Sequence, residues 1–84
     1  MTPSKLQVDQ SLDVRGLDSP TSYHKAVERL QGMADNEVLE LSLDEGESLR
    51  TLPFALRADG HEIVVSEPVQ QGVRLLVRKR ARIQ

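Results

Sequence analysis

The chain has no cysteine and no tryptophan among its 84 residues. Without a thiol it can form no disulfide, no thiolate metal site and no covalent intermediate on cysteine. Tyr23 and Phe54 are the only aromatic residues, so we expect an aliphatic core. No apolar run approaches the roughly 20 residues of a membrane-spanning helix, and no apolar signal region follows Met1–Lys5. These absences predict a cytoplasmic protein without a membrane segment.

The length and the charge balance favour a single small domain. About 60–65% of the unfolded surface can be buried at this size, which allows two packed layers. Hydrophobic residues make up 38% of the chain and charged residues 29%, a globular balance rather than a disordered one. A net charge of −2 disfavours attraction of the whole domain to nucleic acid. We expect a flexible arm over residues 1–9, a monomeric domain over 10–80 and a basic tail over 81–84.

The N-terminal half predicts a strand followed by a helix. Apolar and polar residues alternate over 12–14, as in a strand with one buried face, and Gly16 then permits a turn. Ser19 fits the N-cap of the helix, Pro20 its first position, and Gly32 a left-handed stop. Between these ends, apolar residues recur at the spacing of one helical face, at Tyr23, Ala26, Val27 and Leu30.

The middle of the chain predicts a second strand and a second helix. Val38–Leu43 places three leucines on one face of a strand, Leu39, Leu41 and Leu43. The acidic stretch 44–47 lacks the carboxylate spacing of a calcium loop and is interpreted as a solvated turn. Because proline inside a helix costs about 3 kcal/mol, Pro53 predicts a regular helix that begins near Thr51 or Leu52.

The C-terminal part predicts a hairpin and completes the architecture. Strands over 61–67 and 72–80 are joined by a link that is short enough only for a hairpin. The inner face of the second strand carries Val73, Leu75 and Val77. The order β-α-β-α-β-β predicts an α/β two-layer sandwich, a four-stranded mixed sheet with two helices on one face. The right-handed crossover rule makes the first two strands parallel.

The loop before the first helix is the strongest candidate for a site. It leads from Leu12 to Pro20, and a helix N-terminus presents backbone N–H groups with partial positive charge. Such a position suits an anion or a thiolate, yet residue 19 is a serine. Ser19 as a nucleophile would need a base, and His24 lies five residues on, about 140° around a helix. We therefore expect Ser19 to cap the helix rather than to catalyse.

Neither histidine predicts a metal site. His24 and His61 show no two-histidine spacing, so both are interpreted as surface residues, with no metal and no cofactor. The basic stretch 78–82 contains four cations, which could hold phosphate or an acidic partner. We favour instead a charged edge or terminal strand that resists aggregation, because no interleaved aromatics support nucleic-acid stacking.

Four short motifs in order resemble the TusA/SirA family of small sulfur carriers. The family pattern is Leu-Asp-x-x-Gly, Cys-Pro-x-Pro, Ile-Pro and Gly-His. The chain matches it over about 10–79 with Leu12-Asp13-Val14-Arg15-Gly16, Ser19-Pro20-Thr21-Ser22, Leu52-Pro53 and Gly60-His61. The resemblance implies helices packed on a four-stranded mixed sheet, and a sulfane sulfur held as a cysteine persulfide at the helix start and passed to a partner protein.

The chain departs from that pattern where the chemistry would occur. Ser19 stands at the cysteine position and Ser22 at the second proline, while Asp18 adds a negative charge. A hydroxyl is a far weaker acid than a thiol, whose free pKa is about 8.5, and it cannot carry a transferable persulfide. The leading hypothesis is thus a non-catalytic, protein-binding or regulatory module with a partner in a sulfur-transfer pathway.

The residues expected to bind are those of the loop and helix start, namely Asp13, Arg15, Gly16, Asp18, Ser19, Pro20 and Thr21. Two alternatives remain open. One is a natural sulfur carrier seen as an inactive variant with serine in place of cysteine. The other is an anion-binding or nucleic-acid-binding domain that uses the loop amides, Arg15 and the basic tail.

Overall fold

The sheet is built around the strand that the leucine alternation predicts. In the computed structural model, which describes residues 7–80, β2 spans Val38–Leu43. Its leucines at 39, 41 and 43 are fully buried. β1 (Gln10–Asp13) pairs with β2 in parallel, and β4 (Gly72–Arg78) pairs with the other side of β2 in the antiparallel direction. The predicted parallel pair is confirmed.

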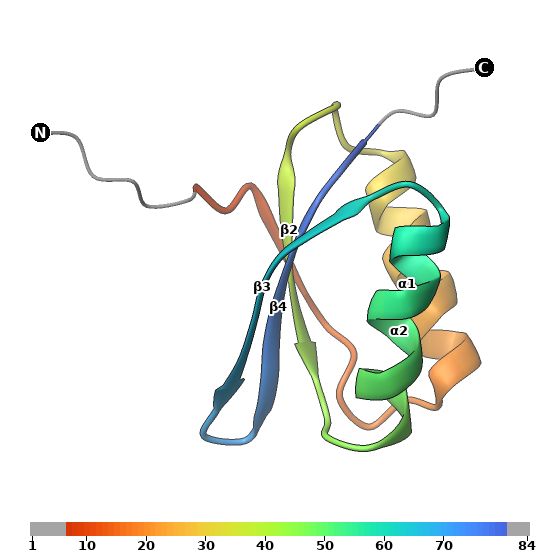
Figure 1. The fold of residues 1–84 in the computed structure, drawn as a ribbon, viewed down its shortest axis with the longest axis vertical. Helices are drawn as coiled ribbons and strands as arrows, with labels where there is room; N and C mark the ends of the chain where they lie inside the picture. The colour runs from red at the N-terminus through yellow and green to blue at the C-terminus, as the bar shows by residue number, and fades with distance from the viewer. Residues whose placement is uncertain (1–6, 81–84) are drawn as a thin grey trace, which may run out of the picture.

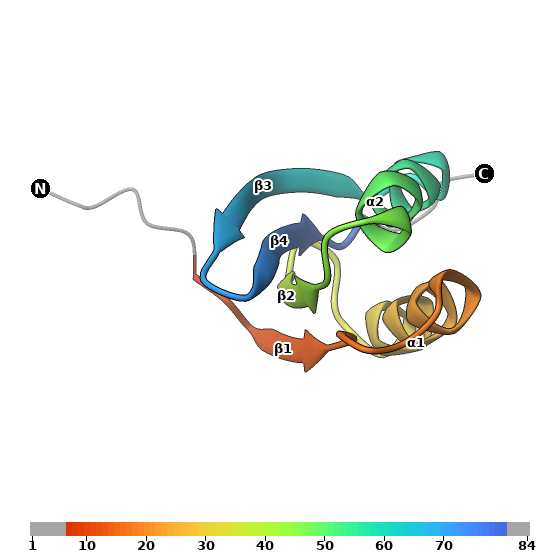
Figure 2. The same cartoon turned by 90° about the horizontal axis from the view of Figure 1, so that it is seen from below.

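Two helices cover one face of this sheet. α1 (Ser19–Gln31) follows β1, and α2 (Glu47–Ala58) follows β2. β3 (Glu62–Val69) forms the second edge of the sheet, whose order is β1-β2-β4-β3. Figure 1 shows this arrangement, and in Figure 2 both helices lie on the same side of the sheet. The predicted element order, mixed sheet and two-layer architecture are confirmed.

The core between the layers is aliphatic, as expected. The buried faces of both helices meet those of the strands, with Ala26, Leu30, Leu52, Leu56, Leu75 and Val77 almost completely buried. Tyr23 and Val27 pack partly buried against this cluster, which confirms the predicted stripe on α1. Within the described residues, neither helix is long and apolar enough to cross a membrane.

The N-terminal boundary of α1 differs from the prediction by one residue. Asp18, not Ser19, is the N-cap, because its carboxylate accepts a hydrogen bond from the backbone N–H of Thr21. Ser19 is thus the first helical residue and Pro20 the second. Serine and aspartate are both strong caps, so composition alone could not choose between them. The prediction that Gly32 ends the helix in a left-handed conformation is also wrong, because the φ of Gly32 is −89°.

The start of α2 lies further from its predicted position, near Thr51 or Leu52, than the start of α1 does. The helix begins at Glu47, so Pro53 lies in its interior rather than in its first turn. The early turns bring Leu49 and Leu52 onto the core-facing side. Complete burial of one leucine side chain contributes about 1.5–3 kcal/mol, so the buried Leu52 together with the partly buried Leu49 offsets much of the cost of about 3 kcal/mol expected for an interior proline.

The C-terminal hairpin is tighter than predicted. β3 runs to Val69, so only Gln70 and Gln71 form the turn, and β4 ends at Arg78 rather than residue 80. β4 lies between β2 and β3. The basic stretch therefore continues from a strand that is central in the sheet and the last one along residues 7–80. Of the two interpretations, the terminal strand agrees with the structure and the edge strand is wrong.

The face of the sheet opposite the helices carries a polar row drawn from all four strands. Arg74 on β4 pairs with Glu40 on β2 and, at 2.7 Å, with Glu67 on β3. The Ser11 hydroxyl on β1 donates to Glu40 Oε1 at 2.9 Å.

Part of the predicted flexible arm (1–9) is bonded to the sheet. Asp9 donates its N–H to the Val38 carbonyl at 2.9 Å and accepts the Val38 N–H at 2.8 Å. The remainder of the predicted arm (1–6) and the predicted tail (81–84) lie outside the described residues.

Candidate functional site

The loop between β1 and α1 lies at the carboxyl end of the parallel strand pair. Because β1 and β2 run in the same direction, the residue that follows β2 reaches this loop. Asp44 is that residue, and its Oδ2 accepts the Gly16 N–H at 2.6 Å. Gly16 has φ +84°, a conformation that favours glycine. The glycine turn is thereby tied to the start of the β2–α2 connection.

Asp13 and Arg15 form a two-pronged ion pair on this loop. Arg15 Nε donates to Asp13 Oδ1 at 2.9 Å and Nη2 to Oδ2 at 2.8 Å, while the Arg15 N–H donates to Oδ1 at 3.0 Å. These hydrogen bonds lower the pKa of Asp13 to about 2 and raise that of Arg15. Arg15 Nη1 also lies 3.5 Å from the Gln71 carbonyl of the β3–β4 turn.

Asp18 fixes the start of α1. Its Oδ1 accepts the Thr21 N–H at 2.8 Å, and its carbonyl accepts the Ser22 N–H at 2.9 Å. The bond from Thr21 lowers the pKa of the Asp18 carboxyl below its ordinary value. The N–H groups of Arg15, Gly16 and Thr21 are therefore all taken by carboxylates of the chain itself.

Ser19 connects the two helices. Its hydroxyl oxygen lies 2.7 Å from Thr51 Oγ1 on α2. The Thr51 hydroxyl donates its single hydrogen to the Glu47 carbonyl at 3.0 Å, so Ser19 is the donor to Thr51. The Ser19 oxygen is thus held by another hydroxyl rather than by an imidazole, and no base is placed on it to make it a nucleophile.

Two positions beside Ser19 complete the helix start. Pro20 has no N–H and is exposed on the first turn. Ser22, at the position where the family pattern has a second proline, is fully buried, and its hydroxyl has no hydrogen-bond partner among residues 7–80.

The structure brings together more residues than the sequence analysis named. The predicted set lies on one continuous loop, but Asp44, Thr51 and Gln71 also contact it. Asp44 could have been found, because it directly follows β2 at the edge where parallel strands end together. Thr51 and Gln71 come from a helix and a hairpin whose placement no local pattern encodes.

The other candidates of the sequence analysis lie elsewhere. His24 is exposed on α1, and His61 Nδ1 accepts the Arg80 N–H at 3.1 Å. Lys79 Nζ donates to the Leu30 and Met33 carbonyls at 2.7 and 3.0 Å, at the C-terminal end of α1. Among residues 7–80, no cluster of three histidine or acidic side chains is placed to hold a metal ion.

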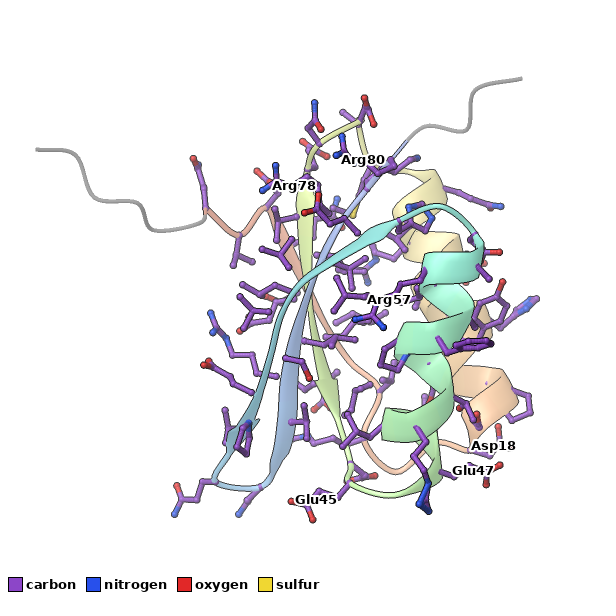
Figure 3. All side chains as sticks on the ribbon, in the orientation of Figure 1. Asp18, Glu45, Glu47, Arg57, Arg78 and Arg80 are labelled. Atoms are coloured by element: carbon purple, nitrogen blue, oxygen red, sulfur yellow. The ribbon has the colours of Figure 1, made fainter. Side chains whose placement is uncertain are left out.

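Charge is distributed unevenly between the two ends of the molecule. Figure 3 shows Asp18, Glu45 and Glu47 at the end that carries the loop, and Arg78 and Arg80 at the opposite end. Arg78 and Arg80 both face Glu62, at 3.8 and 3.4 Å. The loop and the basic stretch therefore do not form one surface.

Comparison with known proteins identifies the family. The model of the family described as sulfurtransferase TusA matches residues 10–79. The chain belongs to the TusA family. A proposed sulfur carrier protein of Thermotoga maritima is 35% identical over 66 residues, which cover 79% of this chain and 84% of the relative. A protein of Archaeoglobus fulgidus with the same description is 25% identical over 77 residues, which cover 90% of this chain and 88% of the relative.

Proposed function

We propose that this TusA-family chain is a non-catalytic module that binds a protein partner through the β1–α1 loop. The observation that carries the proposal is the Ser19 hydroxyl, which stands where the family motif has cysteine and is bound to Thr51 at 2.7 Å. The chain has no cysteine whose thiol could take over the chemistry. The partner-facing residues are those of the loop and helix start, Asp13, Arg15, Gly16, Asp18, Ser19, Pro20 and Thr21.

Sulfur-carrier chemistry at this position is disfavoured by its surroundings as well as by the missing thiol. A reactive thiolate is stabilised by nearby positive charge and by unoccupied N–H groups at a helix start. Here the Thr21 N–H is occupied by Asp18, whose carboxylate adds a negative charge beside Ser19. The local field would therefore oppose an anion at this site.

The same contacts argue against the alternative of a small-anion or nucleic-acid site. The amides that would cradle a phosphate already donate to Asp13, Asp44 and Asp18. The Arg15 guanidinium is neutralised by Asp13. The loop is a protein surface held in place by its own hydrogen bonds, which supports recognition by another protein. The TusA family suggests that this partner belongs to a sulfur-transfer pathway.

The first test measures sulfur transfer by intact mass, using the native chain and Ser19→Cys after incubation with a cysteine desulfurase and cysteine. In the variant, the introduced thiolate would attack the terminal sulfur of the enzyme persulfide, and the enzyme cysteine would leave as a thiolate. We expect the native chain to gain no sulfur atom and the variant to gain one only slowly, because the Asp18 carboxylate beside residue 19 opposes formation of the thiolate. A sulfur gained by the native chain would overturn the non-catalytic assignment.

The second test measures binding of the native chain to the same desulfurase on a biosensor surface. We expect binding that weakens in Arg15→Ala and in Thr21→Asp, with Lys25→Ala on α1 as the matched control. Lys25 is an exposed cation outside the loop. If neither loop variant changed the affinity, or if the native chain did not bind, the loop would not be the docking face for this class of partner.

A further inference from the structure

The outward face of α2 carries an aromatic residue between two cations. Arg50, Phe54 and Arg57 are spaced i, i+4 and i+7 and thus lie on one side of the helix. Leu49, Leu52 and Leu56 occupy the opposite, core-facing side. The Phe54 side chain is 74% exposed, in a chain that has only one other aromatic residue. We call these three outward residues the α2 stripe.

The two arginines of the α2 stripe have no partner in the part of the chain that the structure describes. Among residues 7–80, neither Arg50 nor Arg57 forms an ion pair or a side-chain hydrogen bond, and Figure 3 labels Arg57 on the second half of α2. The other described arginines are all occupied. Four form ion pairs with carboxylates, Arg15, Arg74, Arg78 and Arg80, and Arg29 donates to Gln10 and the Ser11 carbonyl.

This combination is typical of the energetic centre of a protein interface. Arginine and aromatic residues are enriched there, whereas the rest of a surface is dominated by lysine and acidic residues. An exposed phenylalanine gains from burial, and unpaired guanidinium groups on both sides select carboxylates. The net charge of −2 makes such a local excess of positive charge distinctive.

We propose that the α2 stripe docks an acidic protein segment that places one apolar side chain between two carboxylates. The proposal rests on the proposed function in one respect, that the chain acts by protein contact, and it specifies the chemistry of the partner. Seven helical residues rise about 10 Å, so the two partner carboxylates should be about 10 Å apart. On a partner helix this corresponds to acidic residues about seven positions apart, with the apolar residue midway.

The α2 stripe is continuous with the loop. Thr51 lies three residues before Phe54 and is its neighbour on the helix surface, and its hydroxyl binds that of Ser19, so a segment seated over Phe54 extends toward the start of α1. A protein segment is favoured over single-stranded nucleic acid because Phe54 is a single aromatic residue, whereas stacking sites use several along a basic groove.

The experiment uses the isotope-labelled full chain and follows its backbone amides by NMR during titration with synthetic helical peptides. The probe peptide carries two glutamates about seven residues apart with a leucine midway, and its control carries lysines in place of the glutamates. We expect the acidic peptide to shift amides along the outward face of α2, and the lysine peptide to shift none of them. Binding should weaken as the salt concentration rises.

Variants assign the binding to the α2 stripe. Phe54→Ser and the double change Arg50→Gln and Arg57→Gln are each expected to weaken the peptide by about tenfold or more. Lys25→Gln, an exposed cation on α1, should leave the affinity unchanged. Because these side chains are exposed, their replacement should not unfold the protein, and the unchanged dispersion of the NMR spectrum verifies this.

Several outcomes would overturn the proposal. They are equal binding of the lysine peptide, no binding of the acidic peptide, displacement of the acidic peptide by an oligothymidylate, or self-association of the chain that Phe54→Ser abolishes. The two proposals fail separately. Desulfurase binding that depends on Arg15 without peptide binding would reject only the α2 stripe, whereas peptide binding without loop dependence would reject only the loop.

Discussion

The hydroxyl of Ser19 donates to the hydroxyl of Thr51 at 2.7 Å and thereby joins the first turn of α1 to α2. At the position where the family motif places its reactive cysteine, this chain has a structural hydrogen bond. The bond spans 32 residues of sequence and connects the loop to the helix that carries Phe54. It gives Ser19 a role that requires no sulfur chemistry.

A double-mutant cycle of Ser19→Ala and Thr51→Val tests this interhelical bond. A typical hydrogen bond contributes about 0.5–1.5 kcal/mol, and partial exposure places this one near the lower end, so we expect a coupling of about 0.5–1 kcal/mol. The measurement is the free energy of unfolding from urea titrations of the four proteins. Thr51→Val also removes the bond to the Glu47 carbonyl, which the cycle cancels. Strict additivity would show that the two hydroxyls do not interact.

The pKa of Asp13 provides a pH-dependent test of the loop. Arg15 lowers this pKa from 3.8 to about 2, so ionised Asp13 stabilises the fold above the unfolded pKa near 3.8. That contribution is lost as the pH falls from about 4 toward 2. We expect the carboxyl carbon of Asp13 to titrate near pH 2 by NMR in the native chain, and to return toward 3.8 in Arg15→Gln. An unchanged titration in the variant would contradict the two-pronged pair.

Tyr23 can be titrated without interference, because it is the only tyrosine. Its hydroxyl donates to Asp59 at the end of α2, and this bond raises the pKa of Tyr23 above its ordinary value. The protonated phenol therefore stabilises the fold below the unfolded pKa of about 10, and the effect is lost as the pH rises through the folded pKa.

We expect the phenolate absorbance to appear above pH 10 in the native chain and to move down toward the ordinary value in Asp59→Ala. Glu28→Gln removes an exposed acidic residue from α1 and serves as the control for a general charge effect. Equal shifts in the two variants would show that the hydrogen bond to Asp59 does not set this pKa.

Gly72 is expected to tolerate no side chain. A Cβ there would lie 2.1 Å from the Leu43 carbonyl oxygen, and φ is +126°. Gly46 has a similar φ of +117° but open space around the added atom. Backbone strain of about 1–3 kcal/mol should therefore destabilise both alanine variants, while the collision adds a further loss only for Gly72→Ala. Equal free energies of unfolding for the two variants would disprove this collision.

The elements with a strong periodic pattern were predictable from the sequence. The alternation at Leu39, Leu41 and Leu43 identified β2 with its observed bounds, because one face of that strand is completely buried. The start of α2 could not be predicted in the same way. The unfavourable effect of Pro53 is offset by the packing of Leu49 and Leu52 against the core, and helix propensity does not include such tertiary contacts.

The composition of the candidate site was predictable, but its contacts were not. Asp13, Arg15 and Asp18 bond to groups within a few residues along the chain, but the sequence did not show that Asp18 rather than Ser19 caps the helix, because both residue types are strong caps. The bonds of Gly16 to Asp44 and of Ser19 to Thr51 cross 28 and 32 residues. Such contacts depend on how the two layers pack, and only the structure reveals them.

The central position of β4 determines when this protein can complete its fold. β2 pairs with β4, and the Val38–Arg78 pair joins positions 40 residues apart in sequence. During synthesis, β1, β2 and both helices leave the ribosome before Gly72–Arg78, so the edge of β2 stays unpaired until β4 has been made. The sheet is therefore completed only after translation of its last strand, and any chain that stops before Gly72 leaves β2 and β3 with nothing between them.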